Sequence, residues 1–251
     1  MRLVRFNAGD RTACGVLDGD EVVELAGDFF GPLKTLTTRH RLSAVRLLAP
    51  CVPGKIVAVG LNYRDHAAEL GLAVPAEPVI FLKPATAVVG PGGDIRCPPM
   101  SAQVDFEAEL GVVIKDRVKA VGPGEAAEHI LGYTCANDVT ARDLQKKDGQ
   151  WTRAKSFDTF CPVGPWIETE LDSGDLLIES FLNGDRRQSS RTSRFIFPVP
   201  FLVSFISQIM TLLPGDLIIT GTPAGIGPMR PGDEVEVRIE GIGSLRNRVT
   251  R

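Results

Sequence analysis

The segment Asp105-Phe-Glu-Ala-Glu-Leu-Gly-Val-Val-Ile114 places two carboxylates inside an otherwise apolar stretch. On a β-strand successive side chains alternate between faces, so Glu107 and Glu109 would point the same way, with Cα atoms roughly 6.5 to 7 Å apart. The run that ends at Ile114 is apolar on both faces, which is typical of a buried strand. Paired buried carboxylates must be neutralised, and a divalent cation with oxygen ligands is a common solution. The alternative is a half-exposed strand whose glutamates face solvent.

A third oxygen ligand is expected from another part of the chain. Leu131-Gly-Tyr-Thr-Cys-Ala-Asn-Asp138 reads as a strand that ends at Asp138. The next segment, Thr140-Ala-Arg-Asp143, resembles a capping box and predicts a helix that continues to about Lys147. Because Thr140 can cap this helix, Asp138 is free to bind a metal. The alternative is that Asp138 only supports the helix N-terminus through the helix dipole.

A candidate acid–base pair lies in Gly60-Leu-Asn-Tyr-Arg-Asp-His-Ala-Ala-Glu-Leu-Gly71. His66 is followed by Glu69 three residues later, and on a helical turn this spacing puts both side chains on one side. An imidazole oriented by a carboxylate can act as a general base. The alternative is an ordinary surface contact between the two side chains.

Composition limits the classes of function that the chain could have. The 251 residues are 43% hydrophobic and carry 28 Lys+Arg against 31 Asp+Glu, a net charge of −3, which excludes disorder and argues against a nucleic-acid partner. The five cysteines are odd in number and never paired as Cys-x-x-Cys, which favours a reducing compartment over a disulfide framework or a zinc site. The longest apolar helix candidate, Pro200 to Leu213, is too short to cross a bilayer. We therefore expect a cytoplasmic protein with no membrane partner.

Turn signals divide the chain into short strands and indicate a mostly β protein with some α, of the α+β class. Residues 1–53 read as a small N-terminal β-rich domain, and Pro53-Gly54 marks the boundary to a main domain over residues 54–251. The strands expected in the main domain cover residues 55–61, 78–82, 106–114, 176–182 and 234–239, with Asn183-Gly184 as a hairpin turn. A buried helix is predicted from the apolar stripe Phe201, Leu202, Phe205, Ile206, Ile209 and Met210.

Taken together, these segments resemble the fumarylacetoacetate hydrolase family over roughly residues 54–251. The resemblance rests on six motifs in order: Gly60-Leu-Asn-Tyr-Arg-Asp-His66-Ala-Ala-Glu69, Phe81-Leu-Lys-Pro84, Asp105-Phe-Glu107-Ala-Glu109-Leu, Asn137-Asp138-Val-Thr-Ala-Arg142-Asp-Leu-Gln145, Lys155-Ser-Phe-Asp158 and Thr220-Gly-Thr222-Pro-Ala-Gly-Ile-Gly227. It implies a mixed β-roll or sandwich core, a homodimer, and Mg²⁺ or Mn²⁺ bound by three carboxylates. In this sequence those carboxylates map to Glu107, Glu109 and Asp138.

The resemblance also implies roles for other residues. His66, oriented by Glu69, would deprotonate a water molecule, and Lys155 would stabilise an oxyanion or position that water. The positions that hold substrate carboxylate and oxo groups map to Arg142, Gln145 and Thr222. Lys83 is expected near the entrance of the site. The Gly- and Pro-bounded segment from 65 to about 75 is predicted to order over the substrate as a lid.

One departure from the family pattern affects the expected reaction. The longer founding members supply a fourth carboxylate ahead of the histidine, whereas this chain reads Ile56-Val-Ala-Val-Gly-Leu61 there. This favours the short bacterial subgroup, which includes acylpyruvate hydrolases, oxaloacetate decarboxylases and isomerases of aromatic catabolism. The leading expectation is hydrolytic C–C cleavage of an acylpyruvate-type β-diketo acid through a metal enolate. The alternatives are isomerisation of a 2-hydroxy-dienedioate or decarboxylation of a small 2-oxo acid at the same site, and a non-catalytic protein that binds 2-oxo acids.

Overall fold

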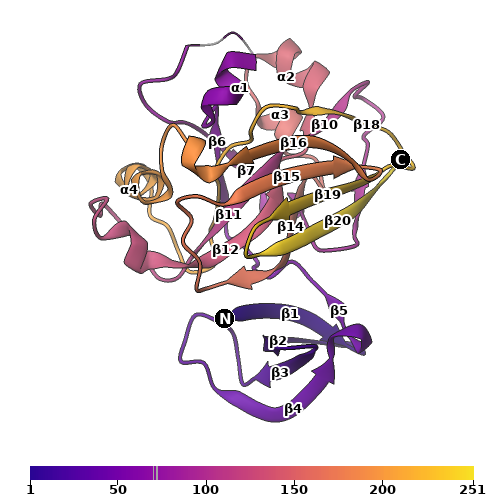
Figure 1. Cartoon of the computed structure of the whole chain (residues 1–251), viewed down its shortest axis with the longest axis vertical. Helices are drawn as coiled ribbons and strands as arrows, with labels where there is room; N and C mark the ends of the chain where they lie inside the picture. Colours follow the sequence, from indigo (N-terminus) through magenta and orange to yellow (C-terminus); the bar gives the residue numbers. More distant parts are fainter. Residues whose placement is uncertain (70, 72) are drawn as a thin grey trace.

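The computed structural model describes residues 1–69, 71 and 73–251, and strands dominate it (Figure 1). Helices α1 (Arg64–Glu69), α2 (Arg142–Asp148) and α3 (Thr152–Lys155) gather at one end of the molecule, and α4 (Val199–Ile209) packs apart from them. Short 3₁₀ turns cover Leu42–Ala44, Ala85–Ala87, Ala126–His129 and Thr192–Arg194. The predicted class, mostly β with α, is confirmed.

The largest sheet contains the segment with the paired glutamates. Its strands are β1 (Arg2–Ala8), β2 (Arg11–Asp18), β3 (Glu21–Leu25), β4 (Thr35–Arg41), β5 (Arg46–Leu47), β6 (Ile56–Gly60), β7 (Val79–Lys83), β8 (Val88–Val89), β11 (Ala108–Ile114), β12 (Ile130–Asn137), β14 (Cys161–Glu168) and β17 (Leu217–Ile219). The main path runs β4-β3-β2-β1-β14-β12-β11-β17-β6-β7, with β5 paired to β1 and β8 paired to β14. The β17–β6 and β14–β8 pairs are parallel, so the sheet is mixed.

Two smaller sheets complete the fold. One has the order β16-β15-β19-β20-β9 and consists of β9 (Asp94–Arg96), β15 (Leu177–Leu182), β16 (Asp185–Arg191), β19 (Glu234–Ile239) and β20 (Gly243–Thr250). The other joins β10 (Val104–Phe106), β13 (Thr140–Ala141) and β18 (Gly227–Met229). The main apolar core lies between the large sheet, the β15–β19 face and α4, where Val112, Ile178 and Leu202 are fully buried.

The N-terminal strands lie at the other end of the molecule from α1–α3 (Figure 1). Strand β1 pairs with β2 along its length and also with β14, through Arg2 opposite Glu168 and Leu3 opposite Ile167. The N-terminal strands are therefore hydrogen-bonded into the large sheet. Among the described residues, none of the helices has the length and apolar character that a bilayer crossing requires.

Local turn chemistry explains the hairpins that the sequence predicted. Strands β15 and β16 are joined at Asn183-Gly184, where both residues have positive φ, 54° and 86°. This is the backbone that a type I′ turn requires, and Asn followed by Gly tolerates it at low cost. The hairpin prediction is confirmed.

Three local predictions are wrong in detail. The strand expected over 106–114 is broken at Glu107, because Phe106 pairs with β18 whereas Ala108 pairs with β12. The amide of Glu107 instead donates to the side-chain Oδ1 of Asn137, 2.9 Å away. The break places Glu107 at a junction between two sheets.

The capping box is also wrong. Thr140 belongs to β13, and its hydroxyl donates to the carbonyl of Asp138 over 2.8 Å, so α2 begins after Ala141 without a side-chain cap. The apolar stripe of α4 is buried at Leu202 and Ile206, but Phe201 is 37% and Ile209 is 53% exposed. The buried face of this helix is therefore narrower than predicted.

Candidate active site

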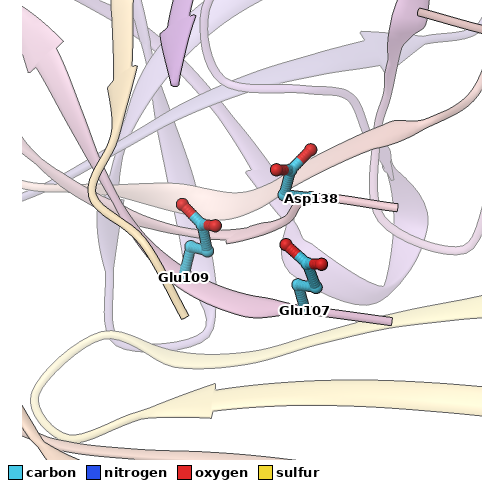
Figure 2. A group of neighbouring side chains, drawn as sticks. All are labelled: Glu107, Glu109 and Asp138. Atoms are coloured by element: carbon cyan, nitrogen blue, oxygen red, sulfur yellow. The ribbon is translucent and has the colours of Figure 1, made fainter. Parts of the chain in front are cut away.

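Three carboxylates converge at the junction of the sheets. Glu107 lies between β10 and β11, Glu109 is on β11, and Asp138 follows β12 directly. One oxygen from each lies within 4.8 Å of the others, and all three side chains are buried. Figure 2 shows Glu107 and Glu109 rising from one segment while Asp138 approaches from the neighbouring one. The predicted convergence of Glu107 and Glu109 is thus confirmed despite the break at Glu107, and the half-exposed alternative is wrong.

Cationic side chains surround two of these carboxylates. Lys155 of α3 donates to Glu107 over 2.9 Å and also to Asp138. Lys83 of β7 donates to the other oxygen of Asp138, and Arg142 of α2 donates to Glu107. Burial alone would raise the pKa of Glu107, but Lys155 and Arg142 outweigh it and hold that pKa below its usual value. Glu107 and Asp138 are therefore charge-compensated by the protein itself.

The protein's cationic side chains compensate the negative charge of Glu109 much less than that of Glu107 or Asp138. Its Oε2 accepts a 2.7 Å hydrogen bond from the Gly221 amide, and no side-chain cation within the described chain bonds to it. Burial raises the pKa of Glu109 well above its usual value, and the charges of Asp138 and Glu107 raise it further. A buried carboxylate beside two others, with one amide donor, fits a site for a hard divalent cation with oxygen ligands.

The histidine and glutamate of α1 form the expected pair. Nδ1 of His66 lies 2.9 Å from Oε2 of Glu69, and Oε1 of Glu69 accepts from the Gly225 amide over 3.0 Å. Asp65 holds the start of the helix, since its Oδ1 accepts from the His66 amide and its Oδ2 from the hydroxyl of Ser190. Because a carboxylate faces Nδ1, the neutral ring carries its proton there and presents Nε2 as the acceptor.

A pocket of about 310 Å³ brings these groups together. It is lined by Val59, Gly60, Leu61, His66, Phe81, Glu107, Glu109, Asp138, Arg142, Gln145, Lys146, Trp151, Lys155 and Thr222. Eight of the predicted site residues are in this lining, and Glu69 contacts it through His66. The predicted position of Lys83 is wrong: this side chain is not at the entrance but 1% exposed behind Asp138, because the carboxylate draws its ammonium inward.

The predicted substrate-binding residues are already engaged with the protein. Arg142 uses Nε on Asp105 at 2.8 Å, Nη1 on Gln145 at 2.6 Å and Nη2 on Glu107. Three of its five N–H donors are used, so two remain for a ligand. The hydroxyl of Thr222 donates to the Ala108 carbonyl over 2.9 Å.

Sequence reasoning missed several residues that shape the site. Asp105 is buried and orients Arg142, although it stands in the same motif as the glutamates. Gln188 is fully buried on β16, accepts from the Ala108 amide and donates to Thr222. Phe81 and Trp151 supply aromatic surface. A carboxylate two residues before Glu107 could have signalled Asp105, whereas Gln188 stands far from the other motifs and carried no signal. The predicted lid includes residues 70 and 72, which lie outside the described residues.

The geometry defines an acid–base pair and an acidic cluster able to hold a metal ion, both facing one pocket. A family model described as fumarylacetoacetate (FAA) hydrolase, C-terminal, matches residues 55–250, and one described as Rv2993c-like, N-terminal, matches residues 1–50. The chain belongs to the fumarylacetoacetate hydrolase family. Members of this family are enzymes, among them isomerases, hydrolases and tautomerases.

Similar proteins refine this placement. Protein Rv2993c of Mycobacterium tuberculosis is 51% identical over 100% of this chain and 98% of its own. Oxaloacetate tautomerase FAHD2B, mitochondrial, of Bos taurus is 45% identical over 82% of this chain and 70% of its own. The structure of 5-carboxymethyl-2-hydroxymuconate delta-isomerase from Mycobacterium smegmatis covers 100% of both chains, with 47% identity and a TM-score of 0.95.

A more distant structure carries a metal. Maleylpyruvate hydrolase from Sphingobium sp. SYK-6, in complex with manganese(II) and pyruvate, is 30% identical and covers 100% of this chain and 99% of its own, with a TM-score of 0.83. Among the relatives described here, those named isomerase and tautomerase are more similar to this chain, at 47% and 45% identity, than the maleylpyruvate hydrolase is.

Proposed function

We propose that this protein is a divalent-metal-dependent enzyme that moves a proton at C3 of a small 2-oxo acid and so interconverts its keto and enol or dienol forms. The observation that carries the proposal is the shared pocket, in which His66 faces the same space as the triad and Lys155. The isomerase and tautomerase relatives, at 47% and 45% identity, favour proton transfer over C–C bond cleavage as the reaction of this protein.

Glu107, Glu109 and Asp138 would hold Mg²⁺ or Mn²⁺, since an all-oxygen set suits both ions. When bound, the ion supplies Lewis-acid polarisation of the substrate's 2-oxo group. The manganese in the maleylpyruvate hydrolase structure supports this assignment without choosing between the ions. One of these three carboxylates, Asp138, also accepts hydrogen bonds from the ammonium groups of Lys155 and Lys83.

The chain's own residues would carry the proton. His66 Nε2 takes the C3 proton, and Glu69 keeps the opposite ring nitrogen protonated and stabilises the imidazolium that forms. The imidazolium then gives this proton to the enolate oxygen, or to the far carbon of a dienolate, and returns to its neutral form. The two unused N–H groups of Arg142 bind the substrate carboxylate, and the hydrogen bond from Arg142 to Gln145 aligns that pair. Lys155 is fixed between two carboxylates, where its charge favours the developing enolate oxygen.

The test is a panel of oxaloacetate, an acylpyruvate and a 2-hydroxy-dienedioate, each followed by ultraviolet loss of the enol with Mg²⁺, Mn²⁺ or chelator. We expect metal-dependent enol decay with a single product of unchanged mass. His66→Asn should suppress the decay, whereas Asp65→Asn, which keeps the ring in place, should retain most of it. Enol decay that is equal with chelator and with metal contradicts the proposal.

Hydrolytic C–C cleavage is the second candidate, because the same pair could activate a water molecule instead of a carbon acid. Oxygen-18 water separates the two reactions. Hydrolysis splits the acylpyruvate into two acids and places one heavy oxygen in a new carboxylate, whereas proton transfer produces no new acid. The non-catalytic alternative would be supported by tight oxalate binding with no turnover of any panel member. The expected homodimer stays a prediction, which light scattering would test.

A further inference from the structure

An indole packs directly on the backbone at the end of β6. A methyl group placed on Gly60 would come within 2.6 and 2.8 Å of two ring carbons of Trp151. Those separations are below van der Waals contact, so any side chain larger than hydrogen at residue 60 would displace the ring. The glycine therefore provides the space in which Trp151 lies.

A second aromatic ring fixes the orientation of this indole. The rings of Phe81 and Trp151 meet edge to face, with centroids 5.2 Å apart and planes at 78°. Edge-to-face pairs of this kind are favourable and directional. Both rings are partly exposed and line the pocket, together with Val59 and Leu61.

Trp151 and Phe81 form an aromatic surface on one side of the pocket, which we call the wall. Helix α3 connects this wall to the polar side of the pocket. The Lys155 amide donates to the Trp151 carbonyl over 3.0 Å, so the indole and the lysine stand one helical turn apart. The ammonium of Lys155 also lies 5.2 Å from the centre of the Phe81 ring. The pocket thus has carboxylates and cations on one side and an aromatic surface adjoining them.

We propose that Trp151 and Phe81, with Gly60 beneath the indole, form the surface that selects the distal chain of the substrate. The proposal rests on the proposed function, because the polar side must hold the 2-oxo acid end for the distal chain to reach the rings. A planar conjugated chain buries apolar area and stacks on these rings, whereas the short polar chain of oxaloacetate does neither. The favoured substrate class is therefore 2-oxo or 2-hydroxy acids with an extended conjugated chain.

Ligand binding tests this without turnover. The probes are oxalate, which has no distal chain, and 4-phenyl-2-oxobut-3-enoate, a conjugated 2-oxo acid, both titrated calorimetrically into the Mg²⁺-loaded protein. Trp151→Ala should weaken binding of the phenyl compound about tenfold and leave the Kd of oxalate within twofold. Trp151→Phe should restore most of the loss. The matched control is Trp166→Phe, which alters the other tryptophan of the chain and should change neither Kd.

Gly60→Ala gives a second route should Trp151→Ala fold poorly, since its methyl group would displace the indole and again weaken only the phenyl compound. An equal loss for both probes, or no loss for either, overturns the assignment of the wall. Failure of oxalate to bind the wild-type protein would refute the metal-dependent site instead. The change in the Kd of the phenyl compound on Trp151→Ala would still show whether Trp151 contacts the distal chain.

Discussion

Glu109→Gln should stabilise the metal-free protein while removing its response to metal. Glu109 is buried, has one amide donor from Gly221, and lies within 4.8 Å of two other carboxylates. At the 4.8 Å limit and an effective dielectric of about 20, a neighbouring negative charge repels an ionised Glu109 by about 3.5 kcal/mol, and more at a shorter separation. Lys155 offsets part of this repulsion, because its charge lowers the pKa of Glu109 against the larger raising effects of burial, Asp138 and Glu107.

The sign of the effect follows from proton linkage. The pKa of Glu109 is higher in the folded than in the unfolded chain, so its contribution is most favourable at low pH and is lost as pH rises above about 4.3 towards the folded pKa. Glutamine keeps the acceptor for the Gly221 amide and carries no charge. At neutral pH we expect a gain of about 2 to 3 kcal/mol, which corresponds to about 5 to 10 °C in Tm for a chain of this size.

The assay is thermal unfolding of the chelator-treated protein, repeated with saturating Mg²⁺ or Mn²⁺. Wild-type protein should gain several degrees from either ion, since ligand binding to the folded state raises Tm, whereas Glu109→Gln should gain almost none. Glu24→Gln is the matched control, because Arg11 binds the Glu24 carboxylate at 2.6 and 2.7 Å in the N-terminal strands. It should lower Tm slightly and keep the full metal response. A metal-free Glu109→Gln protein that is less stable than wild type, or one that responds fully to metal, would refute the reasoning.

Three further outcomes are expected. His66→Asn should lower kcat by about 10² to 10⁴, with the Kd for Mn²⁺ unchanged, as measured by enol decay and metal titration. Asp105→Asn removes the 2.8 Å carboxylate partner of Arg142 and should raise KM about tenfold with a smaller change in kcat; an unchanged KM would argue against a substrate-binding role for Arg142. Arg11 holds the pKa of Glu24 at about 2, so the Arg11–Glu24 ion pair stabilises the folded protein above pH 4.5, and this contribution is lost as pH falls. Acid unfolding curves of wild type and Glu24→Gln should therefore converge towards pH 2.

Local sequence patterns predicted the parts of the site that depend on local geometry. Alternation along a strand correctly put Glu107 and Glu109 on one side, and the three-residue spacing of His66 and Glu69 correctly predicted their contact. The contact of His66 with Glu69 follows from the repeat of one helix, whereas Glu107 and Glu109 converge although the strand is broken at Glu107.

Contacts between distant segments were not predictable in this way. The break at Glu107 depends on the side chain of Asn137, 30 residues away, which takes the place of a strand partner. The position of Lys83 depends on Asp138, 55 residues away, whose carboxylate draws the ammonium into the interior. Thr140 matched a capping box in sequence, but pairing with β10 held it in a strand. In each case a tertiary partner outweighed the local preference.

The central claim is that His66 transfers a proton at C3 of a 2-oxo acid. The most direct test is deuterium exchange at C3 of an acylpyruvate, monitored by proton NMR in D₂O with Mg²⁺ present. Wild-type protein should accelerate loss of the C3 proton signal well beyond Mg²⁺ alone, and both chelator and His66→Asn should remove the acceleration. Exchange that stays at the rate of free Mg²⁺, or that His66→Asn leaves unchanged, would contradict a proton transfer carried by His66 beside a metal held at Glu107, Glu109 and Asp138.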